Sequence, residues 1–143
     1  MTAKNASAKV NHKTILIIED EPHVADMLHD YFHRNKYHTV RCMGAKLIDG
    51  VVHLLEVDGT YLPLEAHRYA VAVIDTRIRD SNLESEDLGK LLHKLDIAVA
   101  YIAGKGDLLT PAMEAACADA GIKSTSFLDG LIHGQIDLRK FHA

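Results

Sequence analysis

The chain lacks the features that mark several protein classes. Its 143 residues include only two cysteines, Cys42 and Cys117, which fit neither a disulfide scaffold nor a zinc site. The net charge is −4, and no block rich in Lys and Arg is present of the kind that binds nucleic acid. The longest apolar runs, residues 70–74 and 97–103, have the length of strands and are too short to span a membrane. The sequence therefore predicts neither a nucleic-acid partner nor a membrane partner.

The first residues also lack the apolar stretch that a signal peptide requires. Residues 1–13, MTAKNASAKVNHK, are small and polar, so they bury too little apolar surface to offset the entropy cost of ordering. We expect a disordered tail over residues 1–13 and a single domain over residues 14–143, since a chain of this length builds one core. A cytoplasmic location is the corresponding expectation.

The rest of the chain alternates between strand-like runs and helical patterns. The segments expected to form strands span residues 14–18, 38–43, 69–74, 97–103 and, with a weaker pattern, 123–128. Helices are expected after Pro22, after Ser85 as an N-cap, after Thr110 and within residues 131–141. Strands that alternate with helices favour right-handed crossovers and a parallel sheet. The sequence therefore predicts a doubly wound α/β domain: a five-stranded parallel sheet with helices on both faces.

An additional segment lies between the second and third expected strands. Its apolar residues repeat at a spacing that fits one face of a helix: Leu47, Ile48, Val51, Val52 and Leu55. Asp58-Gly59, flanked by apolar residues, is a strong hairpin signal. We expect a helix followed by a small hairpin here, and we expect residues 54–64 to expose apolar side chains for binding a partner or a second copy of the chain.

Acidic residues follow two of the expected strands. Glu19 and Asp20 come directly after the first strand, and Asp75 closes the third. Because parallel strands end at the same edge of a sheet, these three carboxylates are expected to converge. Carboxylates gathered in this way repel one another, and a hard divalent cation such as Mg²⁺ relieves the repulsion. The sequence therefore predicts a magnesium site.

The motifs around these acids resemble those of one family. The run Thr14-Ile-Leu-Ile-Ile-Glu-Asp-Glu-Pro22 leads into a helix, and a lone acid closes the later run Ala-Val-Ala-Val-Ile-Asp75. This pattern resembles the receiver domain of two-component response regulators, from about residue 14 to residue 141. The resemblance implies a flavodoxin-like fold in which Glu19 and Asp20 hold Mg²⁺ together with Asp75 and the backbone carbonyl of Arg77. It further implies that Asp75 accepts a phosphoryl group from a histidine kinase or phosphotransfer protein, and that a downstream protein partner receives the signal.

Several positions depart from the pattern of that family. Ala103 stands where a receiver has the Thr or Ser that contacts the phosphoryl group, and Leu128 stands where it has a Lys. Thr125 replaces a frequent aromatic residue, and Arg79 replaces a Pro. Arg77 and Lys105 are the candidate substitutes for the missing cation. The resemblance therefore predicts an atypical receiver whose usual conformational switch is dismantled.

Three functions compete at this stage. The first is a receiver phosphorylated on Asp75, and the second is a pseudo-receiver that serves as an interaction module without phosphorylation. The third is a phosphohydrolase, which is disfavoured because Arg77 occupies the position of a second catalytic Asp. A dinucleotide-binding role is also disfavoured, since acids and not glycines follow the first strand. We expect a signalling protein and not an enzyme.

Overall fold

The computed structural model describes residues 14–34, 36–75, 78, 82–102, 111 and 115. Within these residues the chain forms one parallel sheet, one antiparallel sheet, two α-helices and one short 3-10 helix. The elements, in chain order, are β1 (Thr14–Ile18), α2 (Pro22–Arg34), β2 (His38–Cys42), β3 (Gly44–Ile48), β4 (Val51–Leu55), β5 (Tyr61–Pro63), η1 (Ala66–Arg68), β6 (Val71–Asp75), α3 (Ser85–Lys94) and β7 (Ala98–Ile102).

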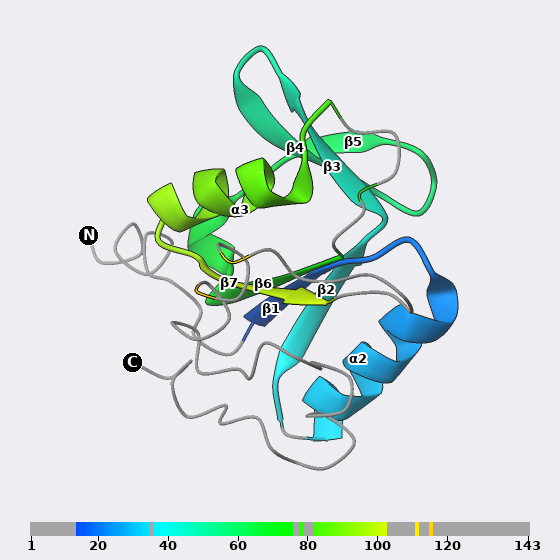
Figure 1. Cartoon of the computed structure of the whole chain (residues 1–143). Coiled ribbons are helices and arrows are strands. Elements are labelled where there is room, and N and C mark those ends of the chain that lie inside the picture. The colour runs from blue at the N-terminus through cyan, green and yellow to red at the C-terminus, as the bar shows by residue number, and fades with distance from the viewer. Residues whose placement is uncertain are drawn as a thin grey trace, which may run out of the picture.

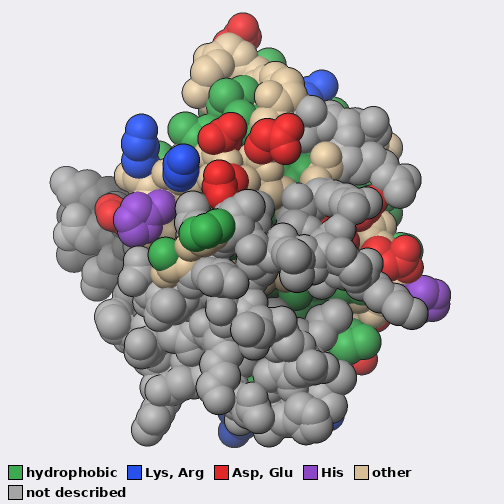
Figure 2. All heavy atoms as spheres, in the orientation of Figure 1, with side chains coloured by type: hydrophobic (Ala, Val, Ile, Leu, Met, Phe, Trp, Pro, Cys, Tyr) green, Lys and Arg blue, Asp and Glu red, His purple; other side chains and the backbone are tan. Residues whose placement is uncertain are grey.

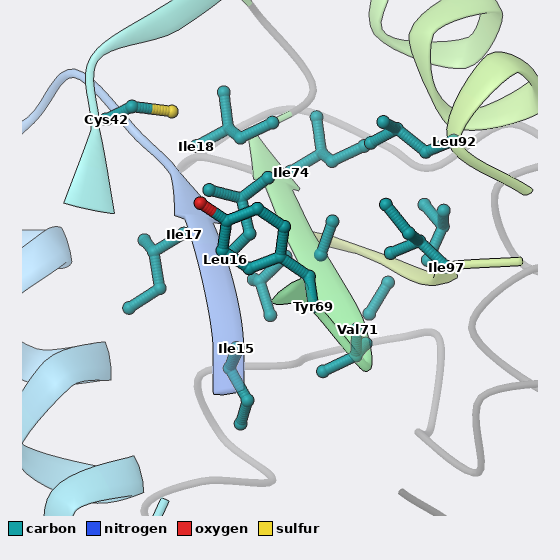
Figure 3. Packing of buried hydrophobic residues seen from close by; sticks show 14 of the residues in the cluster. Ile15, Leu16, Ile17, Ile18, Cys42, Tyr69, Val71, Ile74, Leu92 and Ile97 are labelled. Atoms are coloured by element: carbon teal, nitrogen blue, oxygen red, sulfur yellow. The ribbon is translucent and has the colours of Figure 1, made fainter. Parts of the chain in front are cut away.

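Four strands form a parallel sheet in the order β2-β1-β6-β7 (Figure 1). Every residue of β1 is buried, which explains the apolar residues 15–18 that follow Thr14, because both faces of the strand are covered. In Figure 3 Ile17 lies on the side of α2, whereas Ile74 lies on the side of α3 near Leu92. The expected strands at the positions of β1, β2, β6 and β7 are confirmed, with ends that differ by one or two residues.

The strand order places β1 and β6 side by side at the point where the chain reverses its direction across the sheet. From β1 the chain passes through α2 to β2 on one side, and it later returns to β6 and β7 on the other side. In sheets of this kind ligands bind at the carboxyl ends of the strands that flank such a reversal. The carboxyl ends of β1 and β6 are therefore where a site is expected.

The segment between β2 and β6 forms a second sheet, antiparallel, in the order β3-β4-β5. The expected helix over residues 47–55 is wrong, because Asp49 and Gly50 both take positive φ values and form a tight turn that reverses the chain between β3 and β4. The expected hairpin around Asp58-Gly59 is confirmed, since it joins β4 to β5. Figure 1 shows this sheet at the top of the molecule, with β3 continuing the path of β2.

The predicted fold class is wrong in its overall form. The described residues contain a four-stranded parallel sheet, a separate three-stranded antiparallel sheet and two α-helices, in place of one five-stranded parallel sheet with helices on both faces. The physical reason is the extra segment, which pairs with itself as strands where a crossover helix was expected. The expected strand at residues 123–128 and the expected helices after Thr110 and within residues 131–141 lie outside the described residues.

The two α-helices pack on different strands of the parallel sheet. α2 contacts β1 and β2, and α3 contacts β6 and β7. α3 has acidic residues in its first turn and basic residues in its last, as the helix dipole favours, and Figure 2 shows this change of charge along its surface. Neither of these two helices is long and apolar enough to cross a bilayer.

Candidate functional site

An acidic cluster lies at the carboxyl ends of β1 and β6. Ile18 pairs with Ile74 in the sheet, so the residues that follow them emerge side by side. Glu19, Asp20 and Asp75 each offer a carboxylate oxygen, and these oxygens all lie within 4.8 Å of one another. The prediction that the three carboxylates converge is therefore confirmed.

Backbone hydrogen bonds hold Glu19 in place within the cluster. Its N–H donates to the carbonyl of Cys42 at 3.0 Å, which extends the pairing of β1 with β2 one residue beyond the strand. The N–H of Glu21 donates to Oε2 of Glu19 at 3.2 Å. α2 begins at the next residue, Pro22. The turn from strand to helix thus fixes both the backbone and the carboxylate of Glu19.

The three acids differ in their burial. Glu19 is only 7% exposed, whereas Asp20 and Asp75 are half-buried. The pKa of Glu19 is raised from 4.5 to about 9, mainly by burial and in addition by a hydrogen bond to Asp75 and by the negative charge of Asp75. The hydrogen bond from the N–H of Glu21 lowers this pKa in part. The cluster with a bound proton or a bound cation is therefore more favourable than the cluster with all three carboxylates ionised and no cation.

The donor set suits a hard divalent cation. Carboxylate oxygens are the ligands that Mg²⁺ prefers, and Mg²⁺ keeps several waters when only a few protein ligands are present. Among the described residues, the His, Cys, Asp and Glu side chains that lie close enough together to hold a metal ion are those of this cluster. The acids can thus hold a metal ion, and Glu19, Asp20 and Asp75 would be its ligands.

Other residues that the sequence singled out have no described position. The switch positions, the candidate phosphoryl contacts and the remaining departures from the receiver pattern all lie outside the described residues: Arg77, Arg79, Ala103, Lys105, Thr125 and Leu128. The same holds for Cys117, while Cys42 is buried with its pKa raised to about 12 by burial, as fits a core residue.

Two residues between β6 and the first turn of α3 have roles that the sequence analysis missed. Ser85 was expected as the N-cap of its helix, but Glu84 takes that position and makes no side-chain capping bond. The hydroxyl of Ser85 instead donates to the backbone carbonyl of Asp75 at 2.7 Å. Asn82 bonds with its side-chain amide to both the N–H and the carbonyl of Leu47 in β3, each at 3.0 Å. Both contacts join residues far apart in the chain, so no local pattern signals them.

Comparison with known proteins adds no relative. No model of a known protein family matches the chain, and no curated protein matches it either. The assignment of a function therefore depends on the chemistry of the acidic cluster and of the residues around it.

Proposed function

We propose that this protein is an atypical receiver-like signalling domain that accepts a phosphoryl group on Asp75 in a Mg²⁺-dependent reaction. The observation that carries the proposal is the approach of Glu19, Asp20 and Asp75 to within 4.8 Å at the carboxyl edge of the parallel sheet. The phosphoryl donor would be a histidine kinase or phosphotransfer protein in the cytoplasm. Output would pass to a downstream protein partner through contacts and not through enzymatic turnover.

Each acid has a distinct part in this chemistry. The carboxylate of Asp75 attacks the phosphorus of the donor in line, so a new bond to oxygen forms while the bond to the leaving group of the donor breaks. Mg²⁺, when bound, neutralises charge on the carboxylates and on the phosphoryl oxygens. Glu19 and Asp20 would hold the cation beside Asp75, and the burial of Glu19 would strengthen its electrostatic interactions there.

The sequence departures predict slow transfer and a small conformational response. Ala103 and Leu128 supply neither the hydroxyl nor the ammonium that would hold the phosphoryl oxygens. In a well-studied enzyme the loss of one preorganised donor costs about 10²–10³ in rate. Without such contacts phosphorylation has little means of shifting a conformational equilibrium. Arg77 and Lys105 are the candidate substitutes.

Intact-mass measurement with acetyl phosphate and Mg²⁺ tests the proposal. We expect a phosphoryl adduct in the wild type and none in Asp75→Asn. Asp58→Asn is the matched control, because Asp58 is an exposed aspartate in the hairpin whose hydrogen bond from the N–H of Thr60 an amide oxygen can still accept. Absence of any adduct in the wild type, or an adduct that persists in Asp75→Asn, would contradict the proposal.

The alternative is a pseudo-receiver that binds a partner without phosphorylation. The observation that favours it is exposed apolar surface beside the hairpin, where Val57 is 79% and Leu62 is 48% exposed. Residues 54–64 include the β4–β5 hairpin and expose Val57 and Leu62, whereas their use in binding a partner or a second copy is a prediction. Shortening the hairpin should change sedimentation or partner capture under this alternative, and unaltered behaviour in both assays would make the segment a tolerated insertion.

A further inference from the structure

We infer that Ser85 is a positioning residue for Asp75: it holds the Asp75 backbone so that the carboxylate stays close to Glu19 and Asp20. This inference rests on the proposed function, because it assigns a supporting residue to the same acidic cluster. Ser85 is the first residue of α3, ten positions after Asp75, and it is only 3% exposed.

The hydroxyl of Ser85 donates a hydrogen bond to the end of β6. At the start of a helix a Ser side chain ordinarily bonds to a backbone N–H of the first turn. Here the hydroxyl donates at 2.7 Å to the carbonyl of Asp75, the last residue of β6. Removal of a buried hydroxyl that makes such a hydrogen bond lowers stability. The bond therefore ties the end of β6 to the start of α3.

A second contact fixes the start of α3 from the neighbouring strand. The hydroxyl of Tyr101, in β7, donates to the carbonyl of Ser85 at 3.4 Å and lies 3.5 Å from the carbonyl of Glu86. Gly89 makes room for this ring, since a Cβ at that position would lie 1.7 Å from the Tyr101 hydroxyl oxygen. The backbone of Ser85 is thus held from β7 while its side chain holds β6.

The consequence is preorganisation of the nucleophile. Through the Ser85 bond the start of α3 restrains the backbone of Asp75, whose carboxylate oxygen lies within 4.8 Å of those of the other two acids. Sites of this kind need their groups held within about 0.5 Å of the productive geometry. Loss of the Ser85 hydroxyl should therefore weaken metal binding even though Ser85 touches no metal.

Mn²⁺ titration, followed by the electron paramagnetic resonance signal of the free ion, tests this role in the full-length chain. Ser85→Ala removes the donor, and Ser85→Thr retains it. Thr14→Val is the matched control, because it removes the hydroxyl of a buried residue in the parallel sheet. Thr14 begins β1, whose five residues place it about 13 Å from the carboxyl edge. Urea unfolding of each variant shows whether the losses of stability are comparable.

We expect Ser85→Ala to bind Mn²⁺ about threefold to tenfold more weakly, while Thr14→Val and Ser85→Thr stay within about twofold of the wild type. Equal affinity of Ser85→Ala and wild type would overturn the positioning role and leave the proposed function standing. Equal weakening in Ser85→Ala and Thr14→Val, or a folded Ser85→Thr that binds as weakly as Ser85→Ala, would also overturn it. No Mn²⁺ binding by the wild type would overturn the metal site, the proposed function and this role together.

Discussion

Replacement of Glu19 by Gln probes the electrostatics of the acidic cluster. Gln keeps the shape of the side chain and a carbonyl oxygen that the N–H of Glu21 can still reach, but it cannot ionise. In the wild type, burial together with the hydrogen bond and the charge of Asp75 raises the pKa of Glu19 from 4.5 to about 9. The native state therefore retains the Glu19 proton over a pH range in which the unfolded chain has released it.

The raised pKa makes the native state lose stability as the pH rises. The contribution of the protonated Glu19 to the free energy of unfolding is fully present below the unfolded pKa of 4.5. It is lost as the pH rises through the folded pKa of about 9. Between these values the free energy of unfolding falls by up to about 1.4 kcal/mol per pH unit. From about pH 6 to about pH 8 the wild type would lose up to about 3 kcal/mol, a large share of the roughly 5–15 kcal/mol typical of a domain.

Urea unfolding in the presence of a chelator measures this loss. The informative quantity is the difference in the free energy of unfolding between wild type and Glu19→Gln at each pH, because contributions that the two proteins share cancel in that difference. We expect the free energy of unfolding of the variant, relative to that of the wild type, to increase steadily as the pH rises. Saturating Mg²⁺ should stabilise the wild type at the alkaline end and stabilise the variant much less, because the variant has lost a charged ligand. Identical pH slopes in the two proteins would refute this account of Glu19.

Three further perturbations follow from individual contacts. Asp20→Asn should weaken Mg²⁺ binding, since an amide oxygen carries no charge, and an unchanged titration would reject Asp20 as a ligand. Asn82→Ala removes two hydrogen bonds to the edge of β3, so it should cost about 1–3 kcal/mol in urea unfolding and speed hydrogen exchange at the amide of Leu47; unchanged exchange there would contradict the contact. Gly89→Ala gains about 1 kcal/mol of helix propensity, but its Cβ would overlap the buried Tyr101 side chain, so overpacking of about 1–3 kcal/mol should make the net effect destabilising. A more stable Gly89→Ala variant would show that the Tyr101 ring moves aside freely.

The parallel sheet and the convergence of the acids could be predicted because both depend on strong local patterns. β1 and β6 each contain four consecutive buried apolar residues with an acid directly after them, as expected for strands buried on both faces. Once two such strands are parallel neighbours, their final residues meet at one edge whatever the rest of the fold does. The prediction of the acidic cluster is therefore correct although the predicted fold class is wrong.

The antiparallel sheet was missed because the spacing of its apolar residues fits one face of a helix as well as a pair of strands. Ile48 and Val51 are three positions apart, which suits a helix, yet they also face each other across a turn in the register of β3 and β4. Asp49-Gly50 between them is the same kind of hairpin signal as Asp58-Gly59, and it could have distinguished the two structures. At Ser85 the local capping rule was overridden by a long-range acceptor, the carbonyl of Asp75, that no sequence pattern shows.

Binding of beryllofluoride, followed by fluorine NMR, is the most direct measurement of the central claim that Asp75 and a bound cation together form a phosphoryl-accepting site. Beryllofluoride mimics a phosphoryl group on a carboxylate, so a bound resonance needs both the nucleophile and the charge neutralisation that the other acids support. We predict a bound signal in the wild type that depends on Mg²⁺, weakens in Asp20→Asn and is absent in Asp75→Asn. A bound signal that persists without Asp75, or no bound signal at saturating Mg²⁺, would contradict the claim.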